Sequence, residues 1–146
     1  TTHYRSPTRS PSLIGVAPLD ANCLQQSAAA GPPTHVSGPH RSIMVGLNCG
    51  RPSPVAWPRV STGVDRFASV GDDAARRAMR DLGDAGVVAG ETGAASLAGL
   101  RAALSDHSTR VALGNLADKT ALILVTEGAT DPAAYREIVG LAGSAH

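Results

Sequence analysis

The 146-residue chain has the length of one ordinary domain, and hydrophobic residues make up 42% of it while aromatic residues make up only 3%. Its net charge of +1 argues against the many phosphate contacts that nucleic-acid binding demands, so we expect no nucleic-acid partner. No stretch approaches the roughly 20 apolar residues of a membrane span, and the amino end lacks the apolar core of a secretory signal, so we expect a cytoplasmic protein without membrane contact.

The first twelve residues are mostly Ser, Thr, Pro and Arg, with little to bury, which predicts a disordered leader over residues 1–12. A Ser/Arg-rich tail that is phosphorylated or binds RNA is the alternative, supported only by two short RSP repeats. We expect residues 13–146 to form the folded domain.

Residues 13–40 are predicted to form a strand, a helix and a loop in that order. The apolar run at 13–18, closed by a proline, is typical of a buried strand. The next segment predicts a helix that starts near Asp20 and stops at Gly31. Residues 32–40 are rich in Pro, Gly, Ser and His, which predicts a loop.

The middle of the chain is less regular. Residues 43–47 suit either a strand or a helix, and the glycines and prolines of residues 46–58 favour a loop with Trp57 anchored in it. Residues 65–70 alternate in polarity, which predicts a second strand.

A long helix is predicted next, capped by Asp72 or Asp73 and ended by Gly86. Helical spacing places four apolar residues on one face, which we expect to be buried: Ala75, Ala78, Met79 and Leu82. A further helix is expected after Thr92, with three leucines stacked on one side: Leu97, Leu100 and Leu104.

The carboxyl-terminal part contains the clearest predicted strand, at 121–128. Asp131 is expected to cap the last helix, with Pro132 at its first position. The buried face of that helix is predicted to consist of Tyr135, Ile138 and Val139.

Strands alternating with helices, and strands that are apolar throughout, predict an α/β fold in three layers with a mainly parallel sheet. Ligands of such sheets collect at the carboxyl ends of the strands. The TEG turn at 126–128 lies at such an end, and the GETG turn at 90–93 is expected to lie near another.

Each of these two turns has two interpretations. Thr126 offers a hydroxyl and Gly128 lets a flat ligand come close, but an ordinary strand–turn–helix connection explains them as well. Glu91 stands at a helix amino terminus, where free N–H groups bind anions, or it simply begins a closely packed helix.

The loop at 46–58 adds Asn48 and Cys49 as candidate site residues. A catalytic thiol would need a base, and no histidine is near in sequence, although His35 or His40 could approach in space; a packed small residue is the alternative. Cys23 and Cys49 form no CxxC motif and are expected to be reduced. The histidines show no HxxxH or HExxH spacing, so no metal site is expected.

Three stretches, in this order, resemble the carboxyl-terminal part of the diaminopropionate ammonia-lyase family: SIMVGLNCGRPSPVAWP, VVAGETGAASLAGL and LILVTEGATDPAAYREIVG. Weaker similarity extends the resemblance to residues 13–140. It implies the fold type II (tryptophan synthase beta-like) architecture, pyridoxal 5′-phosphate as cofactor, a small amino acid as substrate, and elimination of 2,3-diaminopropionate to pyruvate and ammonia.

The resemblance also implies site roles. Thr126 matches the hydroxyl that hydrogen-bonds the ring nitrogen of the cofactor, and Glu91 matches the small-residue turn near the same ring edge. Gly128, which lets a flat ligand come close, is assigned to cofactor binding with them. Asn48 and Cys49 match the loop that faces cofactor and substrate. A hydroxyl at the ring nitrogen leaves that nitrogen largely unprotonated, which suits eliminations.

The chain departs from the family in its lysines. The chemistry needs a lysine that holds the cofactor aldehyde, and the family's lysine and phosphate loop lie in a segment before residue 13. Lys119 is the one lysine in the sequence and precedes the last predicted strand, so no catalytic residue is assigned. We therefore expect a truncated form or pseudoenzyme that is inactive alone and does not necessarily bind the cofactor. The alternatives are a non-catalytic α/β protein that binds a partner or forms a homodimer, and one half of a split enzyme.

Overall fold

The computed structural model describes residues 10–140, and its strands and helices confirm the predicted α/β class. The predicted leader lies mostly outside the described residues. In chain order the elements are β1 (Ile14–Pro18), η2 (Leu19–Ala21), α1 (Cys23–Ala30), η3 (Val45–Leu47), α2 (Trp57–Gly63), β2 (Arg66–Val70), α3 (Asp72–Asp84), α4 (Glu91–Ser105), α5 (His107–Leu113) and α6 (Pro132–Val139).

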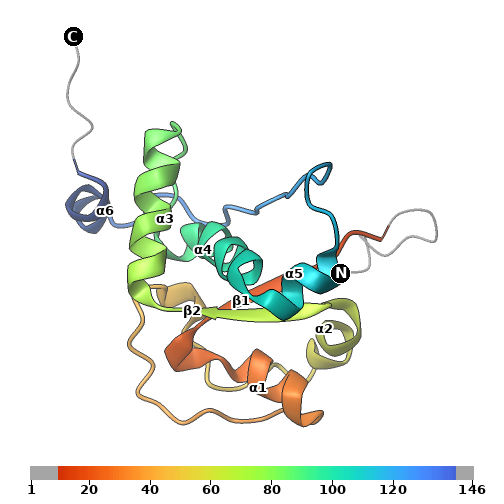
Figure 1. Ribbon diagram of the computed structural model, residues 1–146. Helices are drawn as coiled ribbons and strands as arrows, with labels where there is room; N and C mark the ends of the chain where they lie inside the picture. The colour runs from red at the N-terminus through yellow and green to blue at the C-terminus, as the bar shows by residue number, and fades with distance from the viewer. Residues whose placement is uncertain (1–9, 141–146) are drawn as a thin grey trace.

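The sheet of the described residues consists of β1 and β2, both predicted from sequence, which pair in parallel. The register runs from Ile14 opposite Arg66 to Pro18 opposite Val70. Helices α1 and α2 lie on one side of this pair, and α3, α4 and α5 lie on the other (Figure 1). The sheet therefore forms the middle of three layers, as a covered parallel sheet requires.

Helix α4 lies at the centre of the molecule and packs against both strands, α3 and α5. A Cβ atom on Gly99 would overlap the side chain of Val16 in β1, so this close approach of helix and strand requires glycine. The three leucines that were predicted to stack on one side of this helix are half-buried. The fully buried residues of α4 are instead all small: Gly93, Ala94, Ala95, Ala98, Gly99 and Ala103.

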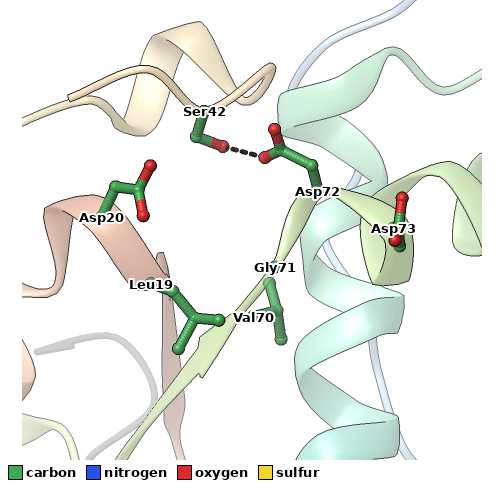
Figure 2. Close-up of a pocket in the computed structure, with 7 residues that line it drawn as sticks. All are labelled: Leu19, Asp20, Ser42, Val70, Gly71, Asp72 and Asp73. Atoms are coloured by element: carbon green, nitrogen blue, oxygen red, sulfur yellow. Dashed lines mark hydrogen bonds between the residues drawn. The ribbon is translucent and has the colours of Figure 1, made fainter.

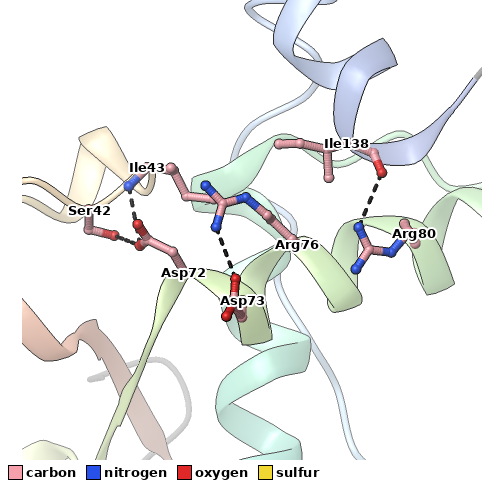
Figure 3. Close-up of polar contacts among 7 residues, drawn as sticks. All are labelled: Ser42, Ile43, Asp72, Asp73, Arg76, Arg80 and Ile138. Atoms are coloured by element: carbon pink, nitrogen blue, oxygen red, sulfur yellow. Dashed lines mark hydrogen bonds and ion pairs between the residues drawn. The ribbon is translucent and has the colours of Figure 1, made fainter.

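Helix α3 buries the four apolar residues that its periodicity predicted. The predicted aspartate cap is wrong, because Gly71 occupies the cap position and Asp72 belongs to the first turn. The Asp72 carboxylate accepts hydrogen bonds from the Ser42 hydroxyl at 2.6 Å and the Ile43 backbone N–H at 3.3 Å, as Figure 3 shows. That aspartate therefore anchors the loop before η3. At the other end, Gly86 turns the chain away with φ +77°.

Two short helices were missed from the sequence. Helix α2 begins at Trp57, which is buried, so the tryptophan predicted to anchor a loop in fact starts a helix. Helix α5 is capped by Asp106, whose carboxylate accepts a hydrogen bond from the Thr109 backbone N–H at 2.7 Å. Both helices have seven residues, which is too short for a clear apolar periodicity.

The last helix is as predicted. The Asp131 carboxylate accepts hydrogen bonds from the backbone N–H groups of Ala133 and Ala134, both at 3.0 Å. Helix α6 lies beside α3, where Arg80 donates to the Ile138 carbonyl at 3.3 Å (Figure 3). Its predicted apolar face packs against the core there.

The strand predicted at 121–128 is wrong for the described residues. The segment is not part of the sheet, and Leu122 and Leu124 are exposed. A strand exists only through hydrogen bonds to a neighbouring strand, and the described residues place no strand beside this segment. Among residues 10–140, no helix has both the length and the apolar character needed to cross a membrane.

Candidate functional site

The structure brings together the three turns that the sequence singled out, at the amino end of α4. The Gly46 N–H donates to the Thr92 hydroxyl at 3.2 Å, and the Gly90 N–H donates to the Glu127 carbonyl at 3.1 Å. We refer to residues 46–49, 90–93 and 126–128 as the three-turn cluster.

Glu127 connects most of this cluster, although no pattern in the sequence marked it as a site residue. One of its carboxylate oxygens accepts from the Thr92 N–H at 3.0 Å, and the other accepts from the Thr130 hydroxyl at 3.0 Å. A carboxylate at a helix amino terminus complements the helix dipole and the free N–H groups there. The amino end of α4 is therefore already occupied by a negative charge of the protein itself.

The glycines of the GETG turn make this arrangement possible. A Cβ atom on Gly90 would overlap the Gly128 carbonyl oxygen, and one on Gly93 would overlap the Glu127 carbonyl oxygen. The small residues therefore serve the close approach of the 127–128 backbone to α4. Any larger residue at either glycine would displace the TEG turn.

Thr126 and Gly128 form the open side of the cluster. Both are exposed, and no described residue forms a hydrogen bond with the Thr126 hydroxyl. A Cβ atom on Gly128 would meet nothing within 4 Å. A flat polar group could therefore approach this edge and receive or donate a hydrogen bond at Thr126.

The other predicted site residues lie in different environments. Glu91 is half-buried in the first turn of α4. Asn48 donates to the Ser42 carbonyl at 2.8 Å, and its own side-chain oxygen is buried without a partner among the described residues. An unsatisfied buried acceptor is costly, and an amide flip would only exchange the unsatisfied atom.

Cys49 faces a different neighbourhood from the open edge. Its exposed thiol donates to the Arg51 carbonyl at 3.0 Å, and its side chain interacts with Cys23. Burial raises the pKa of the Cys23 thiol, and Cys49 raises it further. Both cysteines are free thiols.

A cavity of about 280 Å³ lies at the carboxyl ends of β1 and β2, where ligands of parallel sheets bind. Figure 2 shows the Ser42 hydroxyl pointing toward the Asp72 carboxylate across its rim. Because Ser42 also accepts from Asn48, one chain of hydrogen bonds joins the cavity to the three-turn cluster. The lining residues are Leu19, Asp20, Ser42, Val70, Gly71, Asp72 and Asp73.

Comparison with known proteins gives one consistent result. A family model described as pyridoxal-phosphate dependent enzyme matches residues 2–127. The chain is 38% identical over 143 residues to the diaminopropionate ammonia-lyase of Escherichia coli, covering 92% of this chain and 35% of that protein. It is 36% identical over 141 residues to that of Salmonella typhimurium, covering 88% and 35%.

The fold agrees with these sequence matches. The solved structure of Escherichia coli diaminopropionate ammonia lyase in complex with D-serine matches with a TM-score of 0.72 and 32% identity. The match covers 94% of this chain and 35% of that one. The chain thus spans about a third of the length of the relatives it matches.

Proposed function

The chain belongs to the family of pyridoxal-phosphate dependent enzymes, and on that premise we propose that its 146 residues form the part of a diaminopropionate ammonia-lyase-like enzyme that lies along the ring edge of the cofactor. The family match, residues 2–127, includes the three-turn cluster except for Gly128, and the free Thr126 hydroxyl is the group suited to the ring nitrogen. The reaction of the complete enzyme would be the elimination of 2,3-diaminopropionate to pyruvate and ammonia.

The surrounding residues are assigned supporting roles. The open space beside Gly128 accommodates a flat ring. Glu91 begins the helix next to that ring edge. The loop of Asn48 and Cys49 is assigned to the side of cofactor and substrate, with Asn48 as its contact, because the Cys49 thiol donates to the Arg51 carbonyl instead. The partnerless side-chain oxygen of Asn48 supports this assignment, because a bound group that donates a hydrogen bond would satisfy it.

The described residues do not make a complete site for the cofactor. Its aldehyde needs a lysine, but Lys119 is exposed and donates to the Leu113 carbonyl. Lys119 lies seven residues before Thr126 in the chain, and its hydrogen bond joins it to the carboxyl end of α5 and not to the three-turn cluster. Its phosphate needs free N–H groups, but Glu127 occupies the amino end of α4. We derive no catalytic step from these residues alone.

The position of Lys119 therefore carries the conclusion that this chain has no turnover of its own. The test is to mix the purified chain with pyridoxal phosphate, reduce with borohydride and map adducts by mass spectrometry. We expect no adduct specific to Lys119 and no pyruvate from 2,3-diaminopropionate. Lys119→Arg is the matched control, since it removes the amine and keeps the charge. An adduct on Lys119 accompanied by pyruvate release would overturn the proposal.

A further inference from the structure

Glu127 is the first residue beyond the turn at 116–119 that hydrogen bonds hold in place. Residues 120–126 form no backbone hydrogen bond with a described residue, and the Thr126 hydroxyl has no partner among the described residues either. Glu127 is half-buried, whereas its two neighbours, Thr126 and Gly128, are exposed. Because Thr126 directly precedes it, the hydrogen bonds of Glu127 are the nearest ones that restrain the Thr126 hydroxyl.

The backbone and the side chain of Glu127 are attached to the amino end of α4 separately. The Glu127 carbonyl accepts from the Gly90 N–H at 3.1 Å, and one carboxylate oxygen accepts from the Thr92 N–H at 3.0 Å. The other carboxylate oxygen accepts from the Thr130 hydroxyl at 3.0 Å, which closes the turn from its far side. One attachment alone would leave the turn free to rotate about it, whereas two fix both its position and its rotation.

We propose that Glu127 is a positioning residue: its carboxylate, shared between the Thr92 N–H and the Thr130 hydroxyl, holds the Thr126 hydroxyl in the orientation that a pyridine-type ring nitrogen requires. This inference rests on the proposed function, which assigns Thr126 to the ring nitrogen. Glu127 acts through Thr126 and contacts no ligand itself, because both of its carboxylate oxygens already have protein partners.

The orientation of the Thr126 hydroxyl matters because hydrogen bonds are directional. A hydrogen bond weakens steeply when its donor angle falls below about 120°. An exposed residue without restraint would also have to lose conformational freedom when a ring binds to it, and that loss lowers affinity. Fixing the backbone next to Thr126 before binding reduces the loss, and this is the contribution that we assign to Glu127.

Glu127 offers two properties to this task, its acceptor oxygens and its negative charge, and substitutions separate them. The Thr92 N–H belongs to the first turn of α4, where the helix dipole favours a carboxylate. A glutamine retains an acceptor for the Thr92 N–H, and its amide group can donate to the Thr130 hydroxyl. Glu127→Gln therefore keeps the hydrogen bonds and removes the charge, whereas Glu127→Ala removes both.

The first measurement uses the free chain. NMR relaxation of the full 146-residue chain gives the backbone order parameter of Thr126, which we expect near the value of rigid backbone, about 0.85. It should fall below about 0.6, the range of flexible backbone, in Glu127→Ala and stay near the wild-type value in Glu127→Gln. Thr130→Val removes only one partner of the carboxylate and should give an intermediate value.

Asp131→Ala is the matched control for this measurement. It removes the cap of α6 and leaves every hydrogen bond of Glu127 in place, so the order parameter of Thr126 should not change. Circular dichroism checks that each variant is folded. Thr130 is exposed, so Thr130→Val keeps the test decisive if Glu127→Ala does not fold.

The second measurement is a spectroscopic signature that a purely structural role would not change. Pyridoxine contains the ring but neither the aldehyde nor the phosphate, the two groups for which the described residues offer no partner. The NMR shift of its isotopically labelled ring nitrogen reports hydrogen bonding during a titration with the chain. We expect a saturable shift with the wild type and with Glu127→Gln. Binding should weaken by about fivefold in Glu127→Ala and in Thr126→Val, as the loss of one hydrogen bond predicts.

Three outcomes would overturn the inference. The first is an order parameter of Thr126 and a pyridoxine affinity that are both unchanged in Glu127→Ala. The second is a Glu127→Gln variant as mobile at Thr126 as the alanine variant, because the charge and not the pair of hydrogen bonds would then act. The third is equal mobility in Asp131→Ala, because any loosening of residues 114–140 would then suffice.

Failure of the proposed function is distinguishable from these outcomes. If Thr126 becomes mobile in Glu127→Ala but pyridoxine binds equally well to the wild type and to Thr126→Val, or binds to neither, the ring-nitrogen role of Thr126 is rejected. The fixing of Thr126 by Glu127 would then stand without that role.

Discussion

The core of β1, β2, α3 and α4 and the carboxyl-terminal arm, residues 114–140, are both rich in apolar residues, but only the core is closed. In the core, small residues of α4 let the helix lie directly on β1. In the arm, Leu122 and Leu124 remain exposed. Helices satisfy their backbone groups internally, whereas a strand depends on a neighbour. Apolar sequence alone therefore does not decide whether a segment is buried.

The arm is nevertheless attached to the core at two points. Glu127 holds the TEG turn against the amino end of α4, and α6 packs beside α3. Between α5 and Glu127, the backbone hydrogen bonds among the described residues are confined to the end of α5 at Gly114 and to residues 115–119, and residues 120–126 form none. The position of the core thus depends on close packing, whereas the position of the arm depends on a few polar contacts.

We expect the largest loss of stability from a substitution that disrupts the packing of the core. Gly99→Val would place a branched side chain into the contact with Val16, and overpacking of this kind costs up to about 3 kcal/mol of unfolding free energy. Urea denaturation followed by circular dichroism measures it. Gly128→Ala in the arm is the control, because its Cβ atom meets nothing within 4 Å. Equal stabilities for the two variants would contradict the close approach of α4 and β1.

Detaching the arm from the core should lower the free energy of unfolding by a smaller amount. Glu127→Ala removes the acceptor of the Thr92 N–H, a charge-assisted hydrogen bond at a half-buried position, with an expected loss of about 1.5 kcal/mol. The loss should appear as faster proteolysis and hydrogen exchange over residues 114–130, with little change in the core. Glu91→Ala is the control, because it removes another acidic residue of the same helix end. A uniform loss of protection across core and arm would show that the two regions are not separable.

Weakening the second attachment of the arm, the packing of α6 beside α3, should lower stability by a still smaller amount. Asp131→Ala removes a cap that serves two backbone N–H groups of α6, with an expected cost of about 1 kcal/mol confined to that helix. Hydrogen exchange of α6 measures it. Asp131→Asn retains a capping oxygen and should retain most of the protection. If alanine and asparagine behaved alike, the cap would not hold α6 in place.

The elements that the sequence predicted correctly are those whose signals are local. The buried face of α3 follows from helical spacing, and the start of α6 follows from Asp131 with Pro132. The strand at 121–128 failed because a pleated ladder is a property of two segments, and the sequence of one cannot supply the other. Asp72 failed as a cap because its partner, Ser42, lies thirty residues away.

The candidate site was predictable only in part. The resemblance selected the three turns, and the structure places them together through Gly46, Gly90 and Thr92. The binding roles of Thr126, Glu91, Gly128, Asn48 and Cys49 stay predictions. Glu127 was overlooked because its contact with the amino end of α4 spans thirty-five residues. Such contacts depend on tertiary approach, which periodicity and capping rules do not contain.

The smallest expected change in stability concerns Asp106, which caps α5 at the junction of core and arm. Hydrogen bonds from the Ser108 hydroxyl and from the Thr109 backbone N–H lower the pKa of its carboxyl group from the ordinary 3.8 to about 2. A pKa lowered by folding contributes stability that is complete above pH 4 and is lost as the pH falls toward 2. Asp106→Asn should therefore flatten the pH dependence of unfolding between pH 4 and pH 2, relative to the wild type in matched urea titrations. Asp118→Asn, an exposed substitution in the arm, should leave that dependence unchanged, and an equal flattening by both variants would show that the cap is not its source.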